Sequence, residues 1–315
     1  MLNCKTRVVF AAALVLGVGI SAPATAQNRF RGMPPQSLVD AWERSTKAER
    51  PQITEALLEN RAATVTTLRT EAVAGDTSRK MLACAMLGQL RDTGSVPTLL
   101  TATRDGDARV QERAVTALRV IGDPSAAPRF RQLIRTAPSR ALLKRALAGL
   151  GKVGAAHDVA LIRPLLSDPD ETVQVMAAAA LAMLGNAEGQ DFLLAAIDGD
   201  NPLAQKNATL ALGYLDTPEA RSRLVEIIDD PYARWKSYAL MAQALQDRRA
   251  QTPAQSVATL DRLARGRDRL AAMWALEELA DLGTPEAAQA LQAIAGHKGR
   301  RADVAQVRLE AMEGR

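Results

Sequence analysis

The sequence predicts an all-α fold, an α-solenoid of about eight helix-turn-helix repeats in one curved superhelix. Three observations predict it: a similar phrase recurs at intervals of 31 to 36 residues, alanine is abundant, and only ten of the 315 residues are aromatic. A core built mainly from Ala, Leu and Val suits closely packed helices better than a β-sandwich or barrel. The composition, with two cysteines and 24% charged residues, is that of a globular protein rather than a disordered or disulfide-rich one.

The N-terminal segment 1–26 has the pattern of a cleaved secretory signal. Lys5 and Arg7 precede an uncharged apolar run over 8–20, and Ala24-Thr25-Ala26 supplies a small-residue cleavage site. The apolar run is short for a membrane span, which needs about 20 residues. We therefore expect an exported protein, periplasmic or secreted, with no membrane span in the mature chain. An uncleaved anchor is the alternative.

This assignment divides the chain into a signal peptide at 1–26, a linker at 27–35 and a repeat solenoid at 36–315. Cys4 would be removed with the signal, which leaves Cys84 as the one thiol of the mature chain. A disulfide within that chain is then impossible, although an exported protein meets an oxidising compartment.

Each repeat contains a helix with a defined start and end. In the segments 107–122 and 170–185, an Asp precedes a Val, and apolar or small residues follow that Val at offsets of 4, 7, 8 and 11. This spacing places them on one helical face. The Asp can accept hydrogen bonds from the first free N–H groups, and the closing Gly can adopt the left-handed conformation. A shorter apolar phrase precedes each such helix and predicts its partner helix.

These residues resemble HEAT repeats, in the short form also found in phycobilisome-lyase-type proteins. The resemblance covers about residues 59–315, with a weaker first repeat at 36–58. It implies stacked helix pairs, with the second helices lining the concave side, and mainly a binding role. Trp235 replaces the usual Val, and Asp216 and Asp247 stand where Gly is expected. Bilin-lyase activity is another implication of the resemblance, but the export signal argues against it, because the chromophore-bearing partner is usually intracellular.

Motifs of catalysis and metal binding are lacking in the sequence. The segment 149–154 matches G-x-G-x-x-G, but it ends a predicted helix and follows no strand. His157 and His297 lack partners at metal-ligand spacing, and the Asp-rich turns lack the distal Glu of a calcium loop. We therefore expect no cofactor, no metal site and no catalytic residues, so that the protein is not an enzyme.

Charge is segregated along the chain. The stretch 124–157 holds seven Lys and Arg and no acid, whereas 155–232 holds thirteen acids and four bases. Blocks of sequence become blocks of surface in a solenoid, and a basic block attracts acidic groups. Export argues against nucleic acid, and acidic protein, anionic lipid and polysaccharide are better candidates for the basic block. Of these we expect a protein or peptide partner, acidic ones included. Solvated charges without a specific partner are the alternative, and the oligomeric state is left open.

One column of residues gives the candidate site. The residue nine positions before the end of each repeat lies roughly 85° from the buried centre of the second helix, and it is Arg in three successive repeats. If second helices line the concave side, as the resemblance implies, this position is at the shoulder of the inner surface. Farther along, positions facing away from the buried stripe are apolar, which is typical of a partner groove or of helices buried on both sides. The predicted partner-binding residues are Arg79, Arg113, Arg145, Lys144, Met183, Leu210, Tyr214, Tyr238, Met241 and Trp274.

From the sequence alone we expect an exported, non-catalytic HEAT-repeat scaffold that binds a protein or peptide through its concave face. Arginines would position acidic groups, and the apolar and aromatic residues would bury an apolar segment. The alternative is a lyase-like or other enzyme accessory subunit that holds a substrate.

Overall fold

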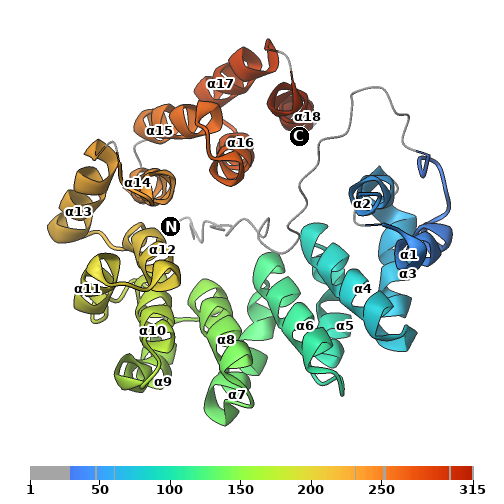
Figure 1. Ribbon diagram of the computed structural model, residues 1–315, viewed down its shortest axis with the longest axis horizontal. Helices are drawn as coiled ribbons and strands as arrows, with labels where there is room; N and C mark the ends of the chain where they lie inside the picture. Colours follow the sequence, from blue (N-terminus) through green and yellow to red (C-terminus); the bar gives the residue numbers. More distant parts are fainter. Residues whose placement is uncertain are drawn as a thin grey trace, which may run out of the picture. The chain divides into compact units, whose positions relative to one another are not determined.

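The computed structural model describes residues 29–313 except 47, 60, 231, 251–252 and 298. The predicted signal peptide lies outside these residues. Every regular element in the described part of the chain is a helix, and it contains no strand (Figure 1). The predicted all-α fold is therefore confirmed. None of the described helices is both long and apolar enough to cross a membrane.

The described chain forms two compact units, which divide between Gly154 and Ala155. The described helices of the first unit are α1 (Pro35–Arg44), α2 (Arg50–Glu59), α3 (Arg61–Ala74), α4 (Thr77–Gln89), α5 (Val96–Ala102), α6 (Ala108–Ile121), α7 (Ala127–Thr136) and α8 (Arg140–Val153), with short 3-10 turns η1 (Thr93–Ser95) and η2 (Pro124–Ala126).

The second unit begins with three short elements, η3 (Ala156–Asp158), α9 (Val159–Ile162) and η4 (Arg163–Ser167). Its longer helices are α10 (Glu171–Met183), α11 (Gln190–Asp198), α12 (Pro202–Leu212), α13 (Pro218–Asp229), α14 (Lys236–Arg249), α15 (Pro253–Arg265), α16 (Arg269–Leu282), α17 (Pro285–Ala295) and α18 (Arg300–Glu313). From α3 onward these elements form eight helix pairs, as the repeat predicts, and α1 with α2 corresponds to the weaker first repeat.

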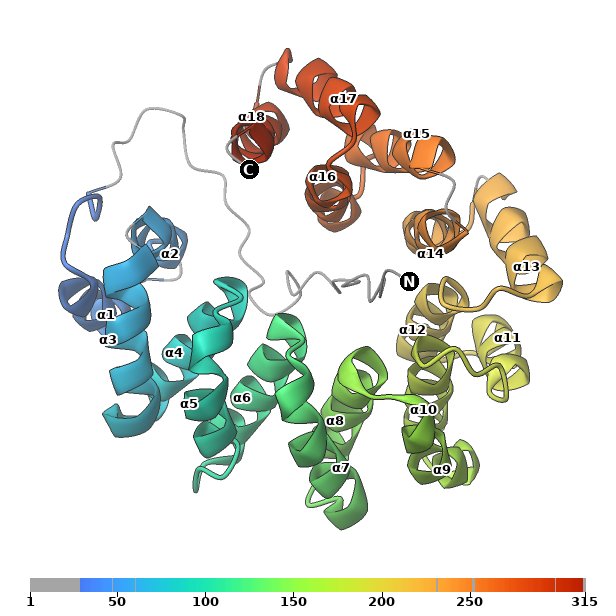
Figure 2. The ribbon, with the colours of Figure 1, turned by 180° about the vertical axis from the view of Figure 1, so that it is seen from behind.

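The second helices of successive pairs stack on one another within each unit. In the first unit α4 packs on α6 and α6 on α8; in the second, α10 packs on α12 and α12 on α14 (Figures 1 and 2). Leu118, Leu150 and Leu181 occupy equivalent positions on α6, α8 and α10 and are fully buried. The recurrent Leu of the repeat phrase is thus the core of the stack, and burying it from water is the main stabilising contribution.

Polar residues cap these helices as the sequence predicts. The carboxylates of Asp107, Asp170 and Asp268 accept hydrogen bonds from backbone N–H groups in the first turns of α6, α10 and α16. Gly122 and Gly185 follow α6 and α10 with φ of 72° and 82°, a region that favours glycine. The caps explain why each helix starts and stops where the repeat phrase does.

Two repeat glycines have other roles than the predicted left-handed cap. Gly154 follows α8 in an extended conformation, with φ of −73° and ψ of −172°. Gly88 lies inside α4, where an added Cβ would stand 2.9 Å from the Cα of Ala117 on α6. In the second unit, a Cβ on Gly213 would stand 2.7 Å from the Cα of Ala242 on α14. Gly88 and Gly213 therefore permit close approach of two second helices.

The G-x-G-x-x-G match has a packing explanation. It lies in and after α8, with no strand before it. A Cβ on Gly149 would stand 2.6 Å from the ring of Phe130 on α7, and that ring is fully buried. The first glycine of the match thus accommodates an aromatic side chain, which agrees with rejecting a dinucleotide site.

Candidate functional site

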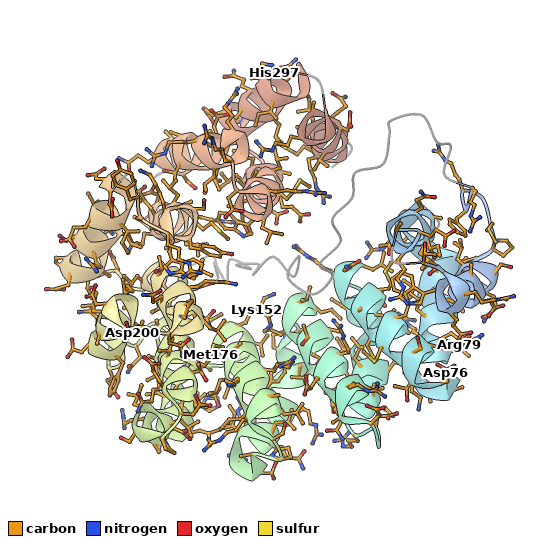
Figure 3. All side chains as sticks on the ribbon, viewed as in Figure 1. Asp76, Arg79, Lys152, Met176, Asp200 and His297 are labelled. Carbon is orange, nitrogen blue, oxygen red and sulfur yellow. The ribbon has the colours of Figure 1, made fainter. Side chains whose placement is uncertain are left out.

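The arginine column of the first unit is carried by α4, α6 and α8, and the structure places its three members in different environments. Arg79 is held by acids from two other helices: its guanidinium lies 2.9 Å from Asp40 and 2.8 Å from Glu43 of α1, and 3.4 Å from Glu71 of α3. The hydrogen bonds to Glu43 are the main reason that the pKa of Arg79 lies above its usual value. Figure 3 shows Arg79 beside Asp76 at the start of α4. Arg79 therefore ties α4 to α1 and α3.

Arg145 is also engaged, but by fewer groups. Its guanidinium lies 2.8 Å from the carboxylate of Glu112 on α6, and it donates a long hydrogen bond of 3.4 Å to the carbonyl oxygen of Ala141. Lys144 beside it on α8 is half-buried. In this part of the column, two cationic side chains lie near one carboxylate, that of Glu112.

Arg113 lies on α6 between these two arginines in the column. Its side chain is half-buried, and no hydrogen bond or ion pair joins its guanidinium to another described residue. Burial lowers the pKa of Arg113, and the positive charge of Arg145 lowers it further. It is the member of the column whose hydrogen-bond donors are left for a molecule outside the described chain.

Some of the basic side chains in the acid-free stretch 124–157 donate hydrogen bonds to groups at helix ends and do not form a surface patch. Lys152 donates to the carbonyl oxygen of Val120 at the end of α6, at 2.8 Å. Arg129 donates to the hydroxyl and the carbonyl oxygen of Thr103, just after α5, at 2.8 and 2.9 Å. Cations are favourable where helix carbonyls point outward. The seven bases of 124–157 are thus not equally available to a partner.

The same column in the second unit has a different chemistry. It holds Met176, Asn207, Tyr238 and Trp274, on α10, α12, α14 and α16. The amide nitrogen of Asn207 lies 3.7 Å from the sulfur of Met176, which Figure 3 labels on α10. The ring of Tyr238 meets that of Trp235 edge to face, with 5.6 Å between their centroids. Met176, Asn207 and Tyr238, with the adjacent Trp235, are half-buried and give a partly accessible surface of polarisable and aromatic groups, whereas Trp274 is buried.

Lys206 belongs to this surface, and the sequence argument missed it. Its ammonium nitrogen lies 5.2 Å from the centroid of the Tyr238 ring, a cation–π contact. Burial lowers the pKa of Lys206 and raises the pKa of Tyr238; for Lys206, the carboxylate of Asp268 partly opposes the change. A signal was available: Lys206 is one of only four bases in the acidic stretch and stands next to the column.

Three of the predicted apolar and aromatic binding residues are buried rather than accessible. Leu210, Tyr214 and Trp274 are only 6%, 4% and 4% exposed. The reason is that α12 and α16 contact helices on several sides, so their buried face is wider than one stripe. Met183, Tyr238 and Met241 are half-buried and partly accessible.

The described side chains form no candidate metal site. Among the described residues, no cluster of three or more His, Cys, Asp or Glu could hold an ion. Cys84 is fully buried, and burial raises the pKa of its thiol to about 12. It is therefore protonated at neutral pH and a poor nucleophile.

Family models match much of the chain. The model of HEAT repeats matches residues 65–151, 128–212 and 159–244, and that of the PBS lyase HEAT-like repeat matches 268–297. The chain belongs to the HEAT-repeat family. The predicted resemblance is thereby confirmed.

Among curated proteins, this HEAT-repeat chain is similar to two subunits of one kind of enzyme. It is 34% identical over 193 residues to phycocyanobilin lyase subunit alpha of Thermosynechococcus vestitus, which covers 56% of this chain and 68% of that relative. It is 29% identical over 153 residues to the subunit of the same name in Nostoc sp., which covers 44% of this chain and 55% of that relative.

Among solved structures, a chain from the complex of CpcE and CpcF of phycocyanin lyase from Nostoc sp. has a similar fold. The TM-score is 0.56 at 20% identity, and the match covers 77% of this chain and 96% of that one. This likeness shows a shared fold.

These relatives overturn the prediction of a non-catalytic binding scaffold that is not an enzyme. Curated HEAT-repeat relatives of this chain carry the name of an enzyme subunit. The prediction failed because the repeat phrase records helix packing, and the residues that distinguish one repeat protein's role from another's lie outside that phrase.

Proposed function

We propose that this HEAT-repeat protein is a lyase-like enzyme subunit that holds a substrate on the second helices of its second unit. The observation that carries the proposal is its 34% identity to phycocyanobilin lyase subunit alpha over 68% of that protein. The substrate class that follows is an open-chain tetrapyrrole, a flat conjugated body bearing carboxylates.

The chemistry of α12 and α14 supports this assignment. A flat conjugated ligand is favoured by aromatic edges and by soft side chains, which Tyr238, Trp235 and Met241 provide. The indole N–H of Trp235 donates to the side-chain oxygen of Gln205 at 3.0 Å, which fixes the ring. A carboxylate of the ligand would be met by the ammonium of Lys206, which has no carboxylate within ion-pair distance in the described chain.

A protein partner is part of the proposal. The relatives are named as alpha subunits, and the structural neighbour comes from a complex of two proteins. We therefore expect this chain to act with a second protein rather than alone. Co-purification from the native host, followed by identification of a stoichiometric second chain, tests this expectation.

Titration of residues 27–315 with phycocyanobilin tests substrate binding. We expect saturable changes in visible absorption and induced circular dichroism. Tyr238→Leu and Lys206→Met should each weaken binding by about tenfold, because each removes a contact at the proposed surface. Tyr232→Leu is the matched control, since Tyr232 belongs to the same unit but is 92% exposed and outside the column. Binding that is absent, or equal in all four proteins, would contradict the proposal.

We also propose that the chain is exported. Lys5, Arg7, the apolar run 8–20 and the cleavage site before Gln27 support it. Export would have the subunit meet its substrate outside the cytoplasm. N-terminal sequencing of the protein from the cell envelope should find Gln27 first; an intact Met1 in a cytoplasmic protein would exclude cleavage.

A further inference from the structure

The three arginines of the first-unit column differ in how much of their charge the protein itself uses. Arg79 meets three carboxylates within 3.4 Å, and Arg145 meets one at 2.8 Å. Arg113, between them on α6, meets none within ion-pair distance in the described chain. The three arginines occupy the same position in the repeat, so the difference in their pairing with carboxylates arises from the neighbouring side chains.

Arg113 is partly desolvated and has no partner for its charge in the described chain. Half-burial removes part of the water around a guanidinium with five N–H donors. No described group accepts a hydrogen bond from it, and none of its nitrogens is fully enclosed by the described chain. Arg145 adds repulsion, and the nearby Glu112 is already bound by Arg145. A methionine or leucine would pack the same stem without a charge.

The carboxylate whose charge acts on Arg113 is Glu112, and Arg145 already binds it. The stretch 124–157, which forms α7 and α8, contains no acidic residue. Cys84 of α4 lies close enough to affect Arg113 electrostatically, but its thiol pKa of about 12 leaves it neutral at physiological pH. Lys144 and Arg145 on α8 add positive potential. An anion from outside would therefore find attraction from several cations and repulsion from few carboxylates.

We propose that Arg113 anchors an oxyanion site on the first unit, which takes a carboxylate or phosphate group of a ligand. The planar fork of a guanidinium can donate two parallel hydrogen bonds to either group. Arg145 and Lys144 contribute charge, and Arg79 contributes to the fold instead. This site is separate from the tetrapyrrole surface of the second unit and does not depend on it.

The test compares residues 27–315 with the variant Arg113→Met, which keeps an apolar stem and removes the donors. Inorganic phosphate and succinate are titrated separately by calorimetry, and thermal unfolding is followed in each at constant ionic strength with chloride as reference. We expect one or both anions to bind the unchanged protein and raise its Tm. Arg113→Met should weaken that binding by about tenfold or more, with an unchanged or higher Tm in chloride.

Arg109→Met is the matched control, because Arg109 lies on the same helix but is paired with Asp107 at 2.7 Å. It should bind the anions as the unchanged protein does. Arg113→Lys, which keeps the charge and loses the fork, should bind with intermediate affinity. A response to phosphate alone or succinate alone assigns the group. No response to either, or an equal response in Arg113→Met, overturns the proposal. So does a marked fall in the Tm of that variant in chloride, since it would make Arg113 a structural residue.

Discussion

The same helical position carries arginine in the first unit and Met, Asn, Tyr and Trp in the second. In the first unit the long charged side chains remain accessible and are sorted by the carboxylates around them, from fully paired Arg79 to open Arg113. In the second unit the column contributes to the core at Trp274 and to an aromatic surface at Tyr238. The repeat phrase thus determines the backbone, while the column beside it is free to take either chemistry.

The largest expected effect comes from truncating the column where it is core. Trp274→Ala should lower the free energy of unfolding by about 3–5 kcal/mol, since it empties a buried indole site. Arg113→Ala, at the same position in the first unit, should have little effect. Urea unfolding of residues 27–315, followed by far-ultraviolet circular dichroism, measures both.

Met273→Ala is the control for that comparison, because Met273 precedes Trp274 on α16 but is half-buried. Met273→Ala should lower the free energy of unfolding clearly less than Trp274→Ala does. Equal effects of the Trp274 and Arg113 truncations would show that the column is equivalent in the two units and would break the contrast.

A smaller effect should be common to both units, at the close contacts between second helices. Gly88→Ala and Gly213→Ala each place a Cβ within 3.0 Å of a neighbouring backbone, so each should destabilise by about 1–3 kcal/mol. Gly106→Ala is the control, because a Cβ there meets nothing within 4 Å. If Gly88→Ala stabilised the protein as Gly→Ala ordinarily does in a helix, the close approach would not be a requirement.

The smallest effect concerns Lys206 and depends on pH. Its pKa is lower in the folded than in the unfolded protein, so above neutrality the unfolded chain binds more protons and folding is favoured as pH rises. Relative to Lys206→Met, the unchanged protein should therefore gain stability between pH 7 and about pH 10. Urea unfolding of both proteins across that range measures the difference. A constant difference, or one of opposite sign, would show that Lys206 is not desolvated.

The sequence predicted the eight helix pairs, the Asp caps and the recurrent core leucines, because each depends on local spacing along a helix. It did not predict the burial of Leu210 and Tyr214. A period of 3.6 residues identifies one buried face, but α12 contacts helices on several sides, and the width of its buried arc depends on tertiary packing. The role of Gly88 was missed for a related reason: a left-handed cap and a close helix contact both require glycine.

The candidate site was predicted in outline, since the arginine column is visible as a spacing. Its sorting into a structural Arg79 and an open Arg113 was not, because the acids that hold Arg79 come from α1 and α3, eight or more residues away in the chain. For the same reason, the number of bases in the stretch 124–157 exceeds the number that is available to a partner. Lys152 and Arg129 donate hydrogen bonds to backbone carbonyl oxygens of the preceding repeat.

The stacking of helices that are close in sequence also bears on how the protein folds. Within each unit the main packing partners, such as α4 with α6 or α15 with α16, are separated by short stretches of chain. Little entropy is lost in closing such short loops, so folding should be fast and should begin in more than one repeat. A nascent chain could order each pair soon after synthesis, without waiting for distant segments.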